Sequence, residues 1–297
     1  MATGDLPAVA RRRVWMALRR AREAKGLTQT QIADEMEWSL SKVMRIEKGE
    51  VNISVSDLRA LLDYLDVNDP AEVKQLLDDA RAARSERRTA GSAFRQHLTT
   101  ATQQLFQYET EAVAIRQFSL VLIPGLLQTE AYARAIFQNV LEKESLSPET
   151  IETRIAIRLR RRESVLDRPD PPQYLFLLDE SVLGRPIGGP HVMGEQLLAL
   201  WQAAQDTSML VRIVPLAAAP TLATLGSFMI LDLDGEGNSA LYREAFISDD
   251  ISHNPAIVSR HRELFEDLWA SSLTVEESAD RIEGAARSML AEEASRA

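Results

Sequence analysis

The chain has 297 residues, 45% of them hydrophobic and 26% charged, with a formal net charge of −10. This length is sufficient for two domains that each bury a core, and the absence of cysteine excludes disulfides, thiolate metal ligands and a cysteine nucleophile. No apolar run is long enough to span a membrane and the first residues lack the apolar centre of a signal peptide, so we expect a cytoplasmic protein.

The charge is distributed unevenly along the chain. Residues 1–90 hold 16 basic and 15 acidic side chains, whereas residues 91–297 hold 18 basic and 29 acidic ones. Within the first part, residues 11–25 carry seven basic side chains and one acidic one. This asymmetry predicts an N-terminal part that faces an anion, attached to an acidic body.

Five short helices are expected in the first 83 residues, which we predict to form an all-α domain. Gly26 is expected to end the first helix, and Thr28 and Ser39 to cap the second and third. Ser54 or Ser56 is expected to cap the fourth. Apolar periodicity and these signals place the helices at about 12–24, 29–36, 39–48, 57–65 and 71–83.

Residues 84–92 are charged and lack periodicity, which predicts a linker. The body, 93–297, is expected to be an α+β domain with a small sheet, in a chain that is mainly α. Helical patterns cover 94–115, 129–141, 149–166, 192–205, 255–271 and 275–291. Strand patterns cover 174–181, 209–215, 226–234 and 239–247.

Residues 27–54 resemble the Xre (Cro/CI-type) helix-turn-helix family. The features that match are Leu27-Thr28-Gln29, Ala33, Ser39, Val43, Arg45-Ile46-Glu47, Gly49, Asn52 and Ser54. A small residue at Ala33 lets two helices cross at close range. The resemblance implies a DNA-binding regulator whose helix 39–48 enters the major groove of double-stranded DNA.

The family's docking mode implies base contacts from the start of that helix, at Ser39, Leu40, Ser41 and Lys42, and one turn later at Arg45. Lys42 and Arg45 can donate to guanine, and Leu40 can cover a thymine methyl group. Gln29 matches a position that holds a phosphate. The alternative for Lys42 and Arg45 is a solvated helix face, in which Arg45 pairs with Glu35 or Glu47.

Two positions depart from the family pattern. Glu37 stands where glycine is usual, so it must adopt a positive φ or a different turn geometry, and Ile53 stands where proline is usual. A separate basic run at residues 11–13 is either an arm for a minor groove or a solubilising start to the first helix.

The body resembles a C-terminal domain found behind Xre modules in many actinobacterial regulators, through residues 115–137, 158–172, 175–189 and 209–216. That domain has no established activity as a class, and its members are described as antitoxin-like and often encoded beside a small partner protein. Leu122, Leu126 and Leu127 are candidate ligand- or partner-binding residues, and the alternative is that they belong to the core.

No catalytic motif is recognised, so we expect neither an enzyme nor a cofactor. Residues 232–238 favour a hairpin turn over a calcium loop, and His191 with Glu195 is too sparse for a metal site. The basic run 158–162 favours salt bridges within the domain over a nucleic-acid patch.

Two functions remain open. One is a homodimeric DNA-binding regulator whose body senses a small-molecule effector. The other is an antitoxin-like protein that captures a small partner protein, with DNA binding as autoregulation.

Overall fold

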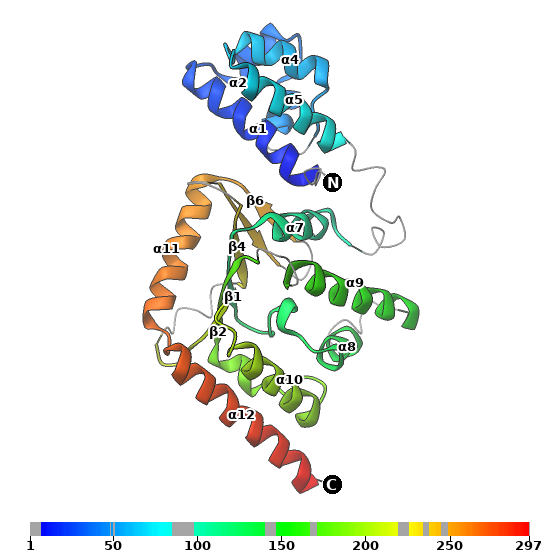
Figure 1. Cartoon of the computed structure of the whole chain (residues 1–297), viewed down its shortest axis with the longest axis vertical. Coiled ribbons are helices and arrows are strands. Elements are labelled where there is room, and N and C mark those ends of the chain that lie inside the picture. Colours follow the sequence, from blue (N-terminus) through cyan, green and yellow to red (C-terminus); the bar gives the residue numbers. More distant parts are fainter. Residues whose placement is uncertain are drawn as a thin grey trace. The chain divides into compact units, whose positions relative to one another are not determined.

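The computed structural model describes residues 7–47, 49, 51–84, 98–139, 147–166, 171–218, 226–233, 238–244 and 249–296 (Figure 1). The chain divides into two compact units, Met1–Ser92 and Ala93–Ala297. Of the predicted linker 84–92, only Arg84 is described, and it ends a helix. Among the described helices, none is long and apolar enough to cross a membrane.

The first unit consists of helices, as predicted. They are α1 (Pro7–Ala24), α2 (Gln29–Glu35), α3 (Leu40–Glu47), α4 (Val55–Tyr64) and α5 (Pro70–Arg84). The apolar stripes of all five helices meet in one core, which includes Leu18, Ile32, Val43, Ile46, Leu58, Leu62 and Leu76. Burial of these stripes holds the short helices together, because helices of this length are marginal in isolation.

The helix ends of this unit use the expected signals. Thr28 and Gln31 form a reciprocal capping box at the start of α2, and the Ser54 hydroxyl accepts from the Asp57 amide at 2.9 Å. Gly26, after α1, has φ 69°. Glu37 has φ 52°, so the first of the two predicted alternatives for this departure is confirmed.

The second unit contains one mixed sheet, which confirms the α+β prediction. Its helices and turns are α7 (Thr100–Glu111), η2 (Gly125–Leu127), α8 (Glu130–Asn139), α9 (Pro148–Leu166), η4 (Glu180–Gly184), α10 (Pro190–Ala203), α11 (Pro255–Ser271) and α12 (Val275–Arg296). Its strands are β1 (Ala114–Ser119), β2 (Gln173–Asp179), β3 (Met209–Val214), β4 (Phe228–Asp232), β5 (Ser239–Arg243) and β6 (Asp250–Ser252).

The sheet has the strand order β3-β2-β1-β4-β5-β6. β1 and β3 run parallel to β2, whereas β4, β5 and β6 continue the sheet in antiparallel pairs. Asp232 pairs with Ser239, so residues 232–238 join two antiparallel strands as the hairpin prediction requires, although residues 234–237 lie outside the described part. Figure 1 shows α11 on one side of the sheet and α8, α9 and α10 on the other.

The expected helix over 94–115 is wrong at both ends within the described residues, since α7 begins at Thr100 after the N-cap Thr99. The helix stops at Glu111, and residues 114–119 form the central strand β1. The strand was predicted as helix because Arg116 and Gln117 are polar, whereas central strands usually consist of consecutive apolar residues. Arg116 is tolerated there because its guanidinium forms an ion pair with Asp232 on the neighbouring strand β4. The short strand β6 was also missed.

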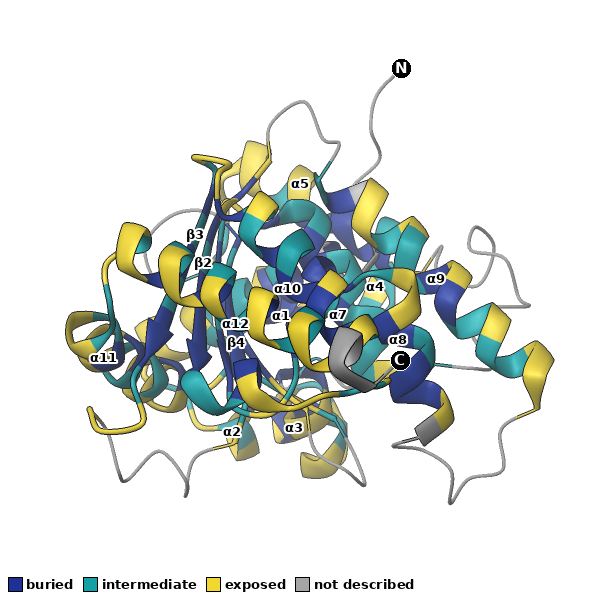
Figure 2. Cartoon of the chain, turned by 90° about the horizontal axis from the view of Figure 1, so that it is seen from below, coloured by how far each residue is buried: buried dark blue, intermediate teal, exposed yellow. Residues whose placement is uncertain are grey.

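The core of the second unit lies on both faces of this sheet. Phe118, Leu177, Phe228 and Ile230 pack against Phe265 and Leu268 of α11. Figure 2 shows the strands in the colour of buried residues, whereas the surrounding helices carry exposed residues on their outer sides.

Candidate nucleic-acid interface

Helices α2 and α3 form a helix-turn-helix whose two inner faces are buried. Ile32 and Ala33 of α2 are 1% and 3% exposed, and Val43 and Ile46 of α3 are 2% and 3% exposed. The turn between them is closed by the Trp38 amide, which donates to the Ala33 carbonyl at 2.8 Å. Together with the positive φ of Glu37, this is a Schellman ending, which fixes the direction in which α3 leaves α2.

The opposite face of α3 points to solvent. Leu40, Ser41, Met44 and Arg45 are exposed, and at about 100° per residue they lie within an arc of about 140°. The predicted residues Leu40, Ser41 and Arg45 therefore share one exposed face, next to the exposed cap Ser39. Met44 was missed by the sequence analysis, although its position four residues after Leu40 places it on the same face.

Lys42 lies at the edge of this exposed face and turns toward the protein. Its Nζ is 3.2 Å from Oδ2 of Asp57 and 3.7 Å from the centre of the Trp38 ring. An exposed ion pair and a cation–π contact each contribute about 1 kcal/mol or less, so the side chain can leave this position at modest cost.

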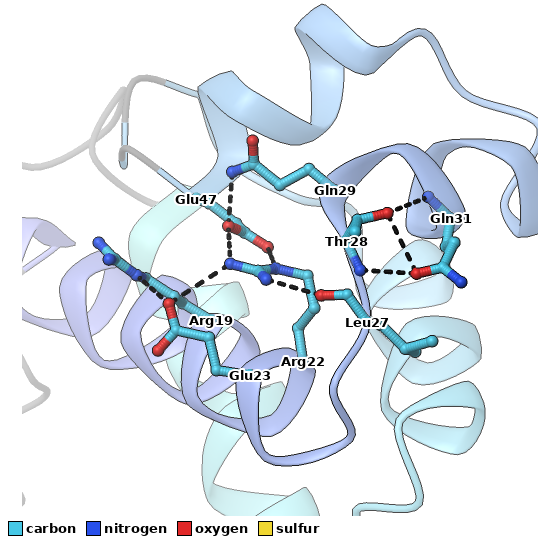
Figure 3. A network of polar contacts seen from close by, with 8 residues as sticks. All are labelled: Arg19, Arg22, Glu23, Leu27, Thr28, Gln29, Gln31 and Glu47. Carbon is cyan, nitrogen blue, oxygen red and sulfur yellow. Dashed lines mark hydrogen bonds and ion pairs between the residues drawn. The ribbon is translucent and has the colours of Figure 1, made fainter.

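A buried carboxylate joins three helices behind the exposed face (Figure 3). Glu47 of α3 is 8% exposed and accepts from Nε of Arg22 on α1 at 2.6 Å. Gln29 of α2 donates from Nε2 to the same carboxylate at 2.7 Å. The hydrogen bond to Glu47 raises the pKa of Arg22, so the guanidinium stays protonated. Glu47 thereby fixes the position of α3 relative to α1 and α2.

Gln29 is oriented by this network. Its Nε2 carries two hydrogens, of which one is donated to Glu47. The second hydrogen is available for another acceptor because Gln29 is only partly buried. The geometry is compatible with the predicted phosphate contact, which stays a prediction.

The basic run at residues 11–13 fits neither of its predicted roles. All three residues belong to α1, so they do not form an extended arm. Arg12 is 2% exposed, and Arg13 donates from Nη2 to the buried carboxylate of Asp79 on α5 at 2.8 Å. Arg12 is therefore an interior residue of the first unit, whereas Arg13, whose side chain is 29% exposed, is partly buried in an ion pair.

Comparison with known protein families assigns both units. Residues 102–284, more than half of the chain, match a family described as Domain of unknown function (DUF5753). The chain belongs to the DUF5753 family. Residues 16–76 match a family described as Helix-turn-helix domain, which supports a DNA-binding regulator. No curated protein and no solved structure matches the chain.

The leucines predicted to bind a partner are largely buried in the DUF5753 domain. Leu126 and Leu127 are 1% and 5% exposed, and Leu122 is partly buried. The alternative interpretation, that these leucines are core residues, therefore describes Leu126 and Leu127 in this conformation. A partner that used them would first have to expose them.

Two buried amides hold this segment in place. Gln196 of α10 is fully buried, donates to the Leu127 carbonyl at 2.9 Å and accepts from the Thr129 amide at 2.7 Å. Gln128 donates to the Ile123 carbonyl at 2.6 Å. Neither glutamine was singled out from the sequence, because a buried amide cannot be distinguished from an exposed one without its partners.

The DUF5753 domain has a concave surface elsewhere. An open groove of about 790 Å³ lies between η4, α12 and the residues that follow β3. Its walls combine apolar side chains, among them Leu216 at 61% exposure, with the acidic residues Glu277 and Asp280. No local sequence pattern predicts this groove, since its walls come from distant segments.

Proposed function

We propose that this protein is a sequence-specific DNA-binding transcriptional regulator of the Xre type that reads the major groove with α3 and acts in the cytoplasm. The exposed face of α3 carries the proposal. Leu40 and Met44 are 44% and 38% exposed, and they stand beside a hydroxyl and a guanidinium on a helix whose other side is anchored by Glu47. Large apolar side chains are seldom left exposed together without a partner.

Each exposed side chain has a chemical role in this proposal. Arg45 donates two hydrogen bonds to a guanine, and Leu40 and Met44 contact thymine methyl groups. Ser41 donates to or accepts from a base edge. Lys42 and Gln29 lie at the margin of the face and bind phosphates, which position the helix without reading sequence.

Selection of binding sites from random duplexes, followed by footprinting, tests this proposal. We expect Arg45→Ala to weaken specific binding by about 1–3 kcal/mol and to relax the preference at one base pair. Lys42→Ala is expected to weaken binding to all duplexes and to reduce the log–log salt slope by about 0.9. Lys74→Ala removes an exposed charge from α5 and is the matched control. Unchanged footprints for Arg45→Ala and Lys42→Ala would show that α3 is not the reading helix.

We further propose that the DUF5753 domain supplies a homodimer and controls DNA binding without catalysing a reaction. One helix-turn-helix contacts few base pairs, and two copies on half-sites about 34–36 Å apart give useful specificity. Light scattering on the full chain and on residues 93–297 tests the assembly, with dimers expected for both. A monomeric body beside a dimeric full chain would place the interface in the first unit.

An antitoxin-like role is the second candidate, and the groove beside α12 favours it. Its exposed Leu216 and acidic rim suit a small protein that presents apolar and basic side chains. Co-expression with the small gene next to this one, followed by size exclusion, tests the candidate. A stable complex that survives Arg45→Ala but not Leu216→Asp is the expected result.

A further inference from the structure

One face of α9 carries three arginines whose side chains turn toward the interior of the DUF5753 domain. The carbon at the centre of the Arg158 guanidinium is 4.9 Å from the centre of the Phe137 ring, and that of Arg154 is 5.9 Å from it. Arg161 lies 4.8 Å above the ring of Phe106. We call Arg154, Arg158, Arg161 and the nearby Arg185 the arginine cluster.

Two of these guanidinium groups converge on Gly125 at the start of η2. A Cβ atom at Gly125 would lie 3.4 Å from Nη1 of Arg161 and 4.0 Å from Nε of Arg158. Arg185 follows η4 and is exposed; its charge and that of Arg158 both act on the buried Tyr132 hydroxyl, where they oppose the rise that burial causes in the pKa. The four positive charges therefore come from α9 and from the residue after η4.

Carboxylates in the described part of the chain neutralise this cluster only in part. Glu109 is fully buried and binds Arg161, with Oε2 2.6 Å from Nε. Arg158 donates instead to the neutral amide oxygen of Gln128. Glu244 is the other carboxylate that acts on Arg158 and Arg161, and it is exposed to solvent. Of Arg158 and Arg161, only Arg161 therefore forms an ion pair within the described residues.

The cluster also contains unsatisfied hydrogen-bonding capacity. Nε of Arg154 is buried, and within the described residues nothing accepts its hydrogen. Burial, followed by the charge of Arg161, lowers the pKa of Arg158 to about 10. The Nε of Arg154 without an acceptor and the lowered pKa of Arg158 both indicate that grouping these guanidinium groups costs free energy, although the net charge of the body is negative. A bound anion would accept the hydrogen of Arg154 Nε and reduce the repulsion between Arg158 and Arg161.

We propose that the arginine cluster binds the phosphate group of a small molecule. A phosphate monoester carries about two negative charges at neutral pH and has three terminal oxygens as acceptors, so it can bind several guanidinium groups at once. Guanidinium groups bind such oxygens in pairs. A carboxylate ligand would bring one charge only.

A small ligand fits better than a nucleic acid. The three arginines of α9 are partly buried, with 12% of the Arg161 side chain exposed, and they lie behind Gly125 and Phe137. A phosphodiester backbone needs an exposed basic surface, whereas a single phosphate group can bind side chains that are only partly exposed. The site belongs to the DUF5753 domain and does not depend on DNA binding by α3.

Thermal unfolding of the full chain tests the proposal, with inorganic phosphate, adenosine monophosphate and sodium chloride of matched ionic strength as additives. We expect a saturable rise in Tm with a phosphate compound and none with chloride. At one hundred times the dissociation constant, linkage corresponds to about 2.7 kcal/mol, or a rise of about 5–10 °C for a domain of this size. Saturation by inorganic phosphate identifies the free ion as sufficient, whereas a response to the monoester alone identifies a larger phosphorylated molecule.

The control variants lie on the same helix. Arg158→Gln should abolish the rise, whatever the Tm of the ligand-free variant, in which the lost contacts to Gln128 and Phe137 oppose the relieved repulsion from Arg161. Arg160→Gln removes an exposed charge from α9 and should retain the full rise. Arg154→Gln gives a second variant of the cluster should the first not fold. Equal responses of Arg158→Gln and Arg160→Gln, or no response above chloride, would overturn the proposal. If Arg158→Gln changes only the binding of a DNA oligonucleotide, measured in parallel, the cluster is a nucleic-acid surface and the proposal is also overturned.

Discussion

A Cβ atom at Gly49, two residues after α3, would lie 2.6 Å from the indole nitrogen of Trp15 on α1, so only glycine fits this close approach. Gly49 has φ 70°, a conformation that disfavours other residues. Gly49→Ala should therefore combine backbone strain with a steric clash and destabilise the first unit by about 2–4 kcal/mol.

Gly26→Ala is the matched control for that experiment. Gly26 has φ 69°, but no atom lies within 4 Å of its Cβ position. Only the strain of about 1–2 kcal/mol should remain. Urea unfolding of both variants separates the two contributions, and equal losses would mean that Trp15 moves away without cost.

The buried carboxylate behind α3 leads to a second prediction. Glu47→Gln should destabilise the first unit by about 2–4 kcal/mol, because Arg22 then keeps a largely buried charge without its main counterion. Glu23→Gln removes an exposed carboxylate that pairs with Arg19 and lies 3.5 Å from Arg22, and it should change stability by less than about 1 kcal/mol. Chemical unfolding at low and high salt is the measurement. A salt-dependent loss for Glu47→Gln as small as that for Glu23→Gln would contradict the burial of this pair.

Asp232 makes the stability of the DUF5753 domain dependent on pH. Burial alone would raise the pKa of Asp232, but hydrogen bonds from Arg262 and Ser239 lower it below its ordinary value. A lowered pKa in the folded state contributes stability above the ordinary value, and this contribution is lost as the pH falls through the folded value. Asp232→Asn should therefore be less stable than the wild type near neutral pH, by about 1–3 kcal/mol, with a smaller difference below about pH 3. Asp267→Asn, an exposed change on α11, should show neither effect, and a constant difference across pH would refute the assignment.

Gln196 provides a fourth prediction. Gln196→Leu keeps the approximate volume but leaves the Leu127 carbonyl and the Thr129 amide without their partner. Each unsatisfied buried group costs about 1–3 kcal/mol, so we expect a loss of about 2–5 kcal/mol and faster hydrogen exchange in the segment after β1. Gln202→Leu on the exposed side of α10 should stay within about 0.5 kcal/mol of the wild type. Similar exchange rates in both variants would show that Gln196 does not hold the segment.

Local signals predicted the first unit well. Thr28, Ser54 and Gly26 act within a few residues of their own position, so their roles are visible in the sequence. The exposed face of α3 follows from helical spacing in the same way. The orientation of Lys42 does not, because Asp57 lies on another helix.

Distant partners explain what was missed in the second unit. Strand β1 was not predicted because it contains the charged Arg116, whose counterion, Asp232, is far along the chain. Leu126 and Leu127 were proposed as a surface because nothing near them in the sequence shows that α10 supplies Gln196 to the same segment. The arginines of α9 were expected to form salt bridges within the domain. Arg161 does so with Glu109, whereas Arg158 binds an amide.

The position of β1 at the centre of the sheet also determines when the second unit can form during synthesis. Phe118 on β1 pairs with Leu177 on β2 and with Phe228 on β4, and the ribosome adds both partners much later. The five helices of the first unit end at Arg84, so this unit can fold before either partner of β1 has been added. A ribosome that has added residues up to about 200 therefore carries a folded first unit and an exposed β1 whose partner strand β4 has not yet been synthesised. That interval is when the chain is most prone to aggregate and most dependent on chaperones.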